Sequence, residues 1–342
     1  MSTQFVEEVR QAVDQHLASF FARERERALV LSGDAALVEA LAELTMRGGK
    51  RLRPALLVAA YRAVKANGAI ADVVSACAGL ELLQTYLLVH DDWMDRDEVR
   101  RGGPSVHAAL RVQVGDAHLG DALAILAGDL GSAYAWELLF GAVVMQPPAP
   151  QVLRAFSTIQ REVVLGQQLD VMGSPEVARM QRLKTGSYTV RGPLRLGALL
   201  GGAHENGPEL RALEDFAEPL GEAFQIADDL LGTFGDPRRT GKPAGNDLRV
   251  GKRTSLVLAA EQRLSPSERE PLSRVLGNPH ADAEDVANAT RLLERSGVRT
   301  HIEARIEALV AQGDEALGRS TLDAEGRRLL AQLARTLAHR ST

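Results

Sequence analysis

The sequence contains a single cysteine and few aromatic residues. Cys77 alone excludes an intrachain disulfide, and its place in an apolar segment indicates a core residue of a protein kept in a reducing compartment. Aromatic residues make up 4% of the 342 residues, while alanine and leucine are abundant, and this balance favours helix-on-helix packing over a β-sheet. We therefore expect a helical protein of the cytoplasm.

Excess positive charge and long apolar runs are missing as well. The formal net charge is −5, so the chain has no overall basic character and nucleic acid is not an expected partner. No N-terminal hydrophobic segment follows a basic region, and no apolar run approaches the ~20 residues that cross a bilayer, so we expect no integral membrane segment. An acidic substrate would have to meet local basic clusters.

Helical periodicity runs through the chain. Residues 3–30 place apolar side chains at helical spacing, and the pattern closes at Ser32-Gly33. Strand patterns bounded by turns appear nowhere, so the predicted fold class is all-α, a bundle of antiparallel helices around a central cavity. We expect a single domain over residues 1–342, with a motif-bearing core at about 45–255 and a C-terminal helical portion at about 256–342.

Clustered carboxylates end an apolar helix within segment 84–107. On a helix, Asp91 and Asp95 lie four residues apart and share one face, while Asp92 is rotated by about 100° from Asp91. Like charges held this close repel each other unless a cation lies between them, and carboxylate oxygens suit Mg²⁺ or Mn²⁺. An isolated cluster of this kind is more often a solvated acidic helix end. The other motifs of the chain favour a metal site instead.

A second apolar helix also ends in paired aspartates. Asp228 follows Asp91 by 137 positions (228 minus 91) and is itself followed by Asp229. A third acidic position, Asp170, comes shortly after Gly166, whose missing side chain permits another segment to approach closely. The likeness of the two aspartate helices suggests pseudosymmetric roles.

Basic residues gather in five places that can meet an anion. Gly48-Gly49 lets backbone N–H groups approach a phosphate, and the flanking lysine and arginines supply charge and forked donors. Lys184 precedes Thr185, a weak anion contact on its own. Segment 240–254 is rich in glycine and cations and is predicted to be a mobile loop or lid. The five clusters are 47–53, 96–101, Lys184, Lys242 and Lys252.

Together these features predict a site for several Mg²⁺ ions that grips a diphosphate, with cations to spare for a second diphosphate. Both acidic helix ends are apolar behind their carboxylates, so an apolar chamber is expected between them. A diphosphate leaving group, Mg²⁺ as a Lewis acid and a chamber that shelters a reactive cation together describe the ionisation of an allylic diphosphate.

The chain resembles the trans-isoprenyl diphosphate synthases of the polyprenyl synthetase family, closest to the short-chain farnesyl and geranylgeranyl enzymes. Residues 91–101 match the first aspartate-rich motif with its two arginines, and 228–232 match the position of the second. The resemblance implies the isoprenoid synthase fold, a homodimer and a dependence on Mg²⁺. It implies three Mg²⁺ ions, which Mn²⁺ could replace. It implies head-to-tail condensation of isopentenyl diphosphate with dimethylallyl, geranyl or farnesyl diphosphate, releasing pyrophosphate.

The resemblance also implies roles for individual residues. Asp91, Asp95 and Asp228 would bind Mg²⁺, supported by Asp92, Asp170 and Asp229. The allylic diphosphate would be held by Arg100, Lys184, Gln225, Lys242 and Lys252, and isopentenyl diphosphate by Gly49, Lys50, Arg53, Arg101 and Gln84. Thr185 and Gln225 would stabilise the carbocation through their oxygens. No side-chain base is nominated, because the family's proton abstraction is attributed to the released pyrophosphate.

Two positions depart from the family pattern. Gly232 stands where the last aspartate of the second motif is usual, which we expect to weaken support for the metal without abolishing activity. Gln84 stands where many relatives have a histidine, and it can donate to phosphate but cannot carry positive charge.

The side chains about one turn before the first motif set product length in this family. Here Tyr86 lies five positions before Asp91, and Leu87 lies four before it. One bulky aromatic residue, with nothing inserted between Asp92 and Asp95, resembles synthases of C20 products, with C15 the next choice. Ordinary core packing is the competing interpretation of Tyr86.

Three other functions fit parts of the pattern. A class I terpene cyclase shares the fold and an aspartate helix but has one substrate diphosphate, so it would not need cluster 47–53 as well as Arg101. A head-to-head prenyl synthase normally has a second motif closer to the first. A non-catalytic regulatory subunit has no reason to keep costly clustered carboxylates on both helices.

Overall fold

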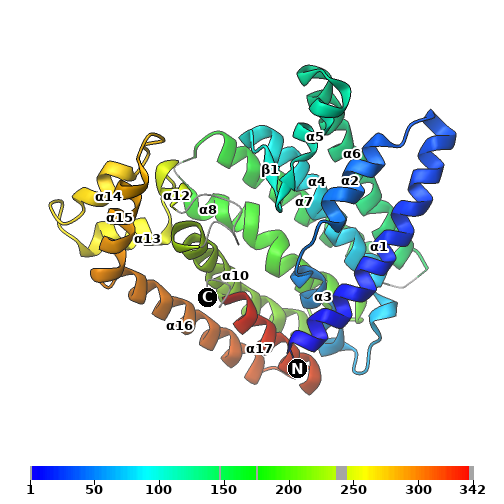
Figure 1. The fold of residues 1–342 in the computed structure, drawn as a ribbon. Coiled ribbons are helices and arrows are strands. Elements are labelled where there is room, and N and C mark those ends of the chain that lie inside the picture. Colours follow the sequence, from blue (N-terminus) through cyan, green and yellow to red (C-terminus); the bar gives the residue numbers. More distant parts are fainter. Residues whose placement is uncertain (1, 146–147, 175, 236–244, 339–342) are drawn as a thin grey trace.

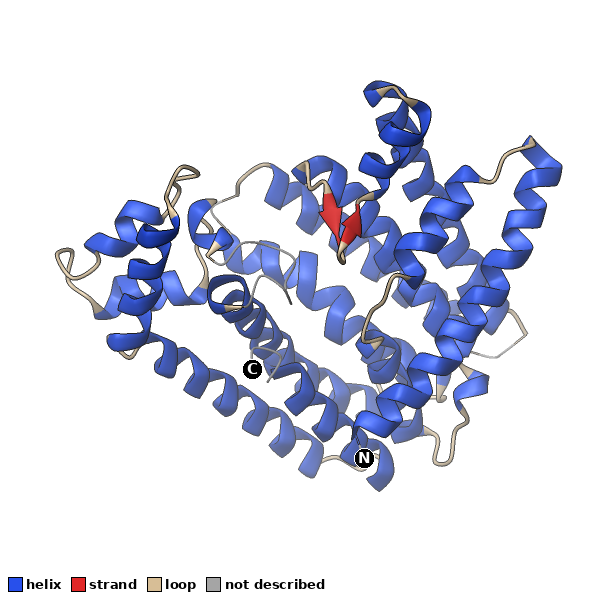
Figure 2. Cartoon of the chain, in the orientation of Figure 1, coloured by secondary structure: helices blue, strands red, loops and turns tan. Residues whose placement is uncertain are grey.

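Helices make up nearly all of the computed structural model, which describes residues 2–145, 148–174, 176–235 and 245–338 (Figures 1 and 2). The predicted all-α class is confirmed. One continuous set of buried apolar side chains runs from Phe5 in the first helix to Ala338 in the last. Both ends of the chain therefore contribute to the same core.

Glycine, aspartate and proline residues mark the ends of the N-terminal helices. Helix α1 (Ser2–Ser32) ends at Gly33, whose φ of 74° is left-handed. Helix α2 (Ala36–Met46) begins where the Asp34 carboxylate accepts the Ala36 N–H at 2.8 Å. Helix α3 (Leu52–Val64) carries Pro54 in its first turn, where no backbone hydrogen bond is lost.

Helix α4 carries the first acidic cluster and packs along α6. A short 3-10 turn, η1 (Ile70–Asp72), leads into α4 (Val74–Asp95), and α5 (Val106–Val114) leads into α6 (Ala117–Val143). A Cβ on Gly79 of α4 would lie 2.9 Å from the Ala135 carbonyl oxygen of α6. The two helices therefore approach as closely as backbones allow, which fixes α4 and its acidic end.

A small hairpin follows α4, contrary to the expectation that strands are absent. Strands β1 (Val99–Arg100) and β2 (Gly103–Pro104) pair antiparallel. The two residues between them, Arg101 and Gly102, have φ of 53° and 74°, the left-handed values of a tight two-residue turn. This turn places the two arginines of the first motif beside the acidic end of α4.

The segment after α6 contains a π-helix that the sequence did not predict. Helix α7 (Ala149–Val171) is followed by α8 (Val177–Gln181), the π-helix η2 (Arg182–Arg191) and α9 (Gly192–Leu200). Helix α9 follows directly on η2, and Pro193 lies in its first turn.

The C-terminal half folds back onto the N-terminal half. Its helices are α10 (Pro208–Phe234), α12 (Asn246–Arg249), α13 (Ser255–Arg263), α14 (Glu270–Val275), α15 (Ala283–Arg295), α16 (Val298–Gly318) and α17 (Ala324–Ala338). Helix α16 packs along α10, and α17 returns to α3 near the N-terminus (Figure 1). A Cβ on Gly326 would lie 2.2 Å from the Ala63 Cα, so α17 and α3 are in backbone contact.

Helix α6 is long and apolar, contrary to the expectation that no apolar run approaches the length of a bilayer span. Among the described residues, its span Ala117–Val143 is the one helix whose length and composition would allow it to cross a membrane. Of its most apolar 18-residue stretch, 44% is buried inside the protein. Apolar side chains of α6 such as Leu126 and Phe140 remain exposed.

Candidate active site

The three carboxylates at the end of α4 point in two directions, as their spacing predicted. Asp92 is fully buried (0% exposed) and accepts a hydrogen bond from Arg100 Nε at 2.7 Å. Asp91 Oδ1 instead accepts bonds from Gln167 Nε2 of α7 at 2.9 Å and from Lys184 Nζ of η2 at 3.0 Å. Asp92 therefore anchors the hairpin arginine, and Asp91 faces the neighbouring helices.

Lys184 joins the first acidic cluster to the third acidic position. Its ammonium group lies 3.0 Å from Asp91 and 2.5 Å from Asp170 Oδ2 of α7. This contact depends on Gly166, because a Cβ there would lie 2.3 Å from the Lys184 backbone nitrogen. The expected close approach at Gly166 is confirmed.

Ionisation in this cluster reflects both burial and crowding of charge. Burial raises the pKa of Asp92 to about 6 although Arg100 opposes it. Burial also raises the pKa of Asp95, and the neighbouring charge of Asp91 adds to the effect. Burial alone would lower the pKa of Lys184, but Asp91 and Asp170 outweigh it and raise that pKa. The acidic face is short of positive charge, which is the condition a bound cation relieves.

On the second acidic helix, too, one aspartate is buried and its neighbour is more accessible. Asp229 is buried and accepts the Ser255 N–H and the Gln225 side-chain amide, each at 3.1 Å, so it ties the start of α13 to α10. Asp228 is only half-buried. Asp229 therefore lies in the interior, and Asp228 is the more accessible of the two carboxylates.

Oxygen ligands are thus available from two helices, which suits Mg²⁺. Within the described residues, no three acidic, histidine or cysteine side chains are already gathered as a ready-made metal site. The carboxylate oxygens present are donors of the kind that a hard divalent cation accepts. On that arrangement Asp91 and Asp95 would face it from α4 and Asp228 from α10.

Cluster 47–53 divides into structural and accessible arginines. Arg51 is buried and pairs with Asp14 at 2.8 Å and Glu81 at 2.5 Å, so it braces α1 against α4. Arg53 lies 4.3 Å from the Tyr188 ring centroid and donates to Thr189 Oγ1 at 2.9 Å. Both contacts of Arg53 come from η2, the segment that also carries Lys184.

Arg101 and Gly49 lie side by side at the hairpin turn. A Cβ on Gly49 would be 3.8 Å from the Arg101 guanidinium nitrogens, and Arg101 Nη1 donates to the Gly48 carbonyl at 2.7 Å. Burial lowers the pKa of Arg101, and the charges of Arg51, Arg53 and Arg100 add to that, although Glu81 opposes them. Gly49 and Arg101 are therefore in contact, and positive charge is concentrated around Arg101.

The remaining predicted residues lie on the expected elements. Gln84 and Leu87 are half-buried on α4, Lys50 is exposed before α3, and Thr185 is half-buried on η2. Tyr86 is 4% exposed, and its ring meets His90 edge-on with centroids 5.8 Å apart. Lys252 lies 3.3 Å from Asp247. Lys242 falls outside the described residues.

Sequence reasoning missed two supports of the site. Gln167 had no predicted role, although its side-chain amide donates to Asp91 Oδ1. Nothing in the sequence indicated the contact of the Tyr188 ring with Arg53, because this contact depends on the π-helical winding of η2. The three-residue spacing of the polar residues Gln167 and Asp170 on one helix was the signal that could have indicated the role of Gln167.

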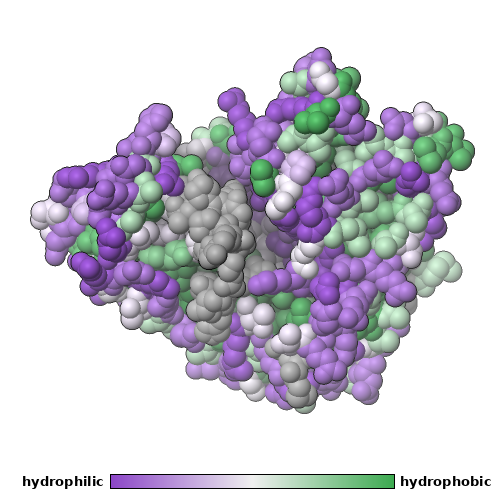
Figure 3. Space-filling model, viewed as in Figure 1, coloured by the Kyte–Doolittle hydropathy of each residue, from purple (hydrophilic) through white to green (hydrophobic). Residues whose placement is uncertain are grey.

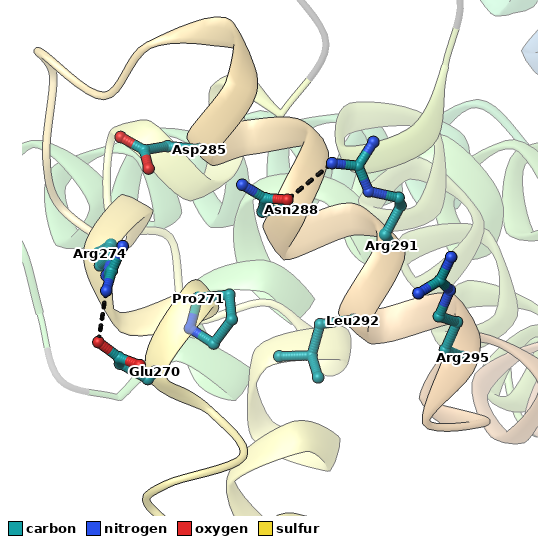
Figure 4. A pocket seen from close by; sticks show the side chains of 8 residues that line it. All are labelled: Glu270, Pro271, Arg274, Asp285, Asn288, Arg291, Leu292 and Arg295. Carbon is teal, nitrogen blue, oxygen red and sulfur yellow. Dashed lines mark hydrogen bonds and ion pairs between the residues drawn. The ribbon is translucent and has the colours of Figure 1, made fainter.

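A surface pocket elsewhere offers little chemistry. It lies between α14 and α15, away from the end of α4 (Figures 1 and 4). Its arginines are engaged locally, Arg274 with Glu270 at 2.6 Å and Arg291 with Asn288 at 2.7 Å. We assign the site to the acidic helix ends rather than to this pocket.

An all-α fold with two acidic helix ends and a neighbouring arginine cluster is the class of protein that the structure defines. Comparison with known proteins narrows this class. Residues 34–293 match the model of the polyprenyl synthetase family, and the chain belongs to that family. The predicted kind of enzyme, a prenyl transferase that makes polyprenyl diphosphates, is thereby confirmed.

Individual relatives span most of the chain. It is 34% identical over 298 residues to the short chain isoprenyl diphosphate synthase of Methanocaldococcus jannaschii, covering 85% of this chain and 84% of that protein. It is 34% identical to the farnesyl diphosphate synthase of Geobacillus stearothermophilus, covering 85% and 96%. The crystal structure of geranylgeranyl pyrophosphate synthase from Corynebacterium glutamicum, complexed with isoprenyl diphosphate and magnesium, superposes with a TM-score of 0.84, 32% identity and 99% coverage of both chains.

Proposed function

We propose that the protein condenses isopentenyl diphosphate head-to-tail with an allylic diphosphate to give a short all-trans prenyl diphosphate, C20 in preference to C15. The allylic C–O bond breaks, a C–C bond forms to isopentenyl diphosphate, one proton is lost and pyrophosphate leaves. Mg²⁺, when bound, would supply Lewis-acid neutralisation of the leaving diphosphate. Three ions are proposed, with Mn²⁺ able to replace them.

The observation that carries this proposal is the link from Asp91 through Lys184 to Asp170, beside the pair Arg100–Asp92. Lys184 and Arg100 are held at the acidic face by carboxylates on two helices, so they are positioned for the oxygens of a diphosphate that displaces those contacts. Gln225, Lys242 and Lys252 are proposed to bind the same group. Thr185 is proposed to face the carbocation.

The second basic cluster supports a second diphosphate. Gly49 lies beside Arg101 at the hairpin turn, and the positive charge of Arg53 acts on Arg101. Lys50 follows Gly49 in the sequence, and Gln84 is half-buried on α4. We assign isopentenyl diphosphate to this cluster. A terpene cyclase has one diphosphate and no use for this cluster, which favours the synthase.

A homodimer is proposed from the exposed apolar surface. Leu126 and Phe140 of α6 are each 52% exposed, and the free end of α1, where Val30 and Leu31 are each 86% exposed, gathers further hydrophobic side chains (Figure 3). A second copy that covers α6 would explain why a long helix with so apolar a face stays in water. We propose that the dimer is cytoplasmic.

Removal of the Asp228 carboxylate tests the assignment of the site. In an Asp228→Ala variant, pyrophosphate release from an allylic substrate with isopentenyl diphosphate should fall by on the order of 10²-fold or more, since a ligand of the transition-state charge is lost. Full turnover by this variant would overturn the placement of α10 in the site. Circular dichroism establishes that the variant is folded.

A further inference from the structure

Arg51 has a backbone conformation that a residue with a side chain rarely adopts. Its φ of 46° lies in the left-handed region, and it comes shortly after Gly48 and Gly49, whose φ values of 106° and 149° are also positive. Glycine would take the left-handed conformation without a steric cost, whereas arginine does not. Such a conformation persists where the surroundings hold it in place, so the contacts of the Arg51 side chain need an explanation.

The Arg51 guanidinium joins three helices. Its Nε donates to Asp14 of α1 at 2.8 Å, its Nη1 to Glu81 of α4 at 2.5 Å, and its Nη2 to the Thr45 carbonyl of α2 at 2.8 Å. The Arg51 carbonyl accepts the Ala55 N–H at 3.0 Å and so begins α3. Because the forked donors have a rigid geometry, these bonds fix the start of α3 relative to the other three helices.

The basic cluster to which isopentenyl diphosphate is assigned lies against this guanidinium. A Cβ on Gly49 would be 3.2 Å from Arg51 Nη1 and 3.8 Å from the terminal nitrogens of Arg101. Arg101 Nη1 donates to the Leu44 carbonyl at 3.2 Å, and Leu44 directly precedes Thr45. Consecutive carbonyls near the end of α2 therefore hold the two guanidinium groups, and Gly49 lies close to both.

Arg51 itself is too buried to bind a ligand. It is 3% exposed, and the carboxylates of Asp14 and Glu81 flank its single positive charge. Burial alone would lower the pKa of Arg51, but Glu81 and Asp14 outweigh it and raise that pKa. A guanidinium balanced in this way has little charge to offer a diphosphate. The loop beside it, with the exposed Lys50, is the part that a ligand can reach.

We propose that Arg51 is a positioning residue for isopentenyl diphosphate, which holds loop 47–50 and the first turn of α3 and thereby places Lys50 and Arg53 without touching the substrate. The inference rests on the proposed function. The buried pair of Arg51 and Glu81 thus serves the recognition of one substrate as well as the stability of the bundle.

A neutral double variant separates these two roles. Arg51→Met leaves the Glu81 carboxylate buried without its partner, so it should lower the melting temperature. Adding Glu81→Gln removes that unpaired charge, and the double variant keeps the net charge around the cluster, because one charge of each sign is lost. Arg62→Gln is the control on the same helix, since Arg62 donates to the Gly68 carbonyl at 3.0 Å and lies 3.4 Å from Glu325.

Steady-state kinetics measures the KM for each substrate, and calorimetry measures the binding of isopentenyl diphosphate alone. The double variant should recover most of the melting temperature that Arg51→Met loses. Its KM for isopentenyl diphosphate should stay raised on the order of tenfold, the effect of losing one hydrogen bond to a charged group, with weaker binding by calorimetry. The KM for the allylic diphosphate should not change, and Arg62→Gln should leave both KM values unchanged.

Arg51→Lys provides a second variant that keeps the buried charge. Lysine lacks the planar fork that reaches three helices, so this variant should also raise the KM for isopentenyl diphosphate. A normal KM in Arg51→Lys, recovery of that KM together with the melting temperature in the double variant, or an equal rise for both substrates would overturn the inference. If the wild-type chain neither bound nor consumed isopentenyl diphosphate, the proposed function itself would fall.

Discussion

Gly166 is the residue on which the position of Lys184 depends. An alanine there would bring a methyl group within 2.3 Å of the Lys184 backbone nitrogen, so α7 and η2 would have to separate. We predict that Gly166→Ala lowers kcat by on the order of 10²-fold, because a displacement of about 1 Å in a positioned catalytic group has that effect. Steady-state kinetics with both diphosphates measures it.

Gly221 on α10 is the matched control for that substitution. Nothing lies within 4 Å of a Cβ added there. Gly221→Ala should therefore stabilise the protein by about 0.5–1 kcal/mol, as expected for a helical glycine with open space, and leave kcat unchanged. Equal kinetics for the two variants would contradict the role given to Gly166.

His107 should make stability depend on pH. Burial lowers the pKa of His107 below its usual 6.5, Arg111 adds to the shift and Glu98 opposes it. Because the folded chain keeps this imidazole neutral, its contribution is complete above pH 6.5 and is lost as the pH falls from there through the lower folded pKa.

We predict that His107→Gln flattens the change in melting temperature between about pH 7 and about pH 5. The same substitution at the exposed His118 should leave the wild-type profile unchanged. A His107→Gln profile as steep as the wild type would show that other groups determine the pH dependence.

Helix α4 was predictable in detail because its information is local. Its apolar run, the i and i+4 spacing of Asp91 and Asp95 and the different direction of Asp92 follow from helical geometry. Segment η2 was not predictable, because its π-helical winding accompanies contacts with Gly166 and Arg53 from distant parts of the chain. The hairpin was missed because its strands are two residues each, too short for any alternation to show.

Tyr86 is the side chain of α4 that we expect to limit product length. It is buried against α6, where a Cβ on Gly131 would lie 3.1 Å from the Tyr86 Cβ. Tyr86→Ala should open the space below the first acidic cluster and shift the products to longer chains, measured by mass spectrometry of the prenyl diphosphates.

Tyr134→Ala provides the comparison for Tyr86. Tyr134 is buried on α6 and packs edge-on against Phe20 at 5.1 Å, so both variants lose an aromatic side chain from the core at a cost of about 3–5 kcal/mol. Only Tyr86→Ala should lengthen the product. Unchanged product length in a folded Tyr86→Ala variant would place the floor of the chamber elsewhere.

The proposed homodimer depends on the exposed apolar surface of α6. Phe140→Asp on α6 should convert a dimer of 36.8 kDa chains to monomers, because a charge buried in an apolar interface without a partner is strongly unfavourable. Light scattering after gel filtration measures the mass. Leu258→Asp on α13, also at a partly exposed apolar position, should stay dimeric. A wild-type monomer would contradict the proposal.

The most direct test of the proposed reaction is to supply the wild-type protein and Mg²⁺ with isopentenyl diphosphate and, in turn, C5, C10 and C15 allylic diphosphates. We predict that mass spectrometry finds elongated prenyl diphosphates, ending mainly at C20, and that chelation of Mg²⁺ stops their formation. Hydrocarbons or alcohols released with pyrophosphate would indicate a cyclase instead. Failure to consume any primer would contradict catalysis and leave the regulatory subunit as the function.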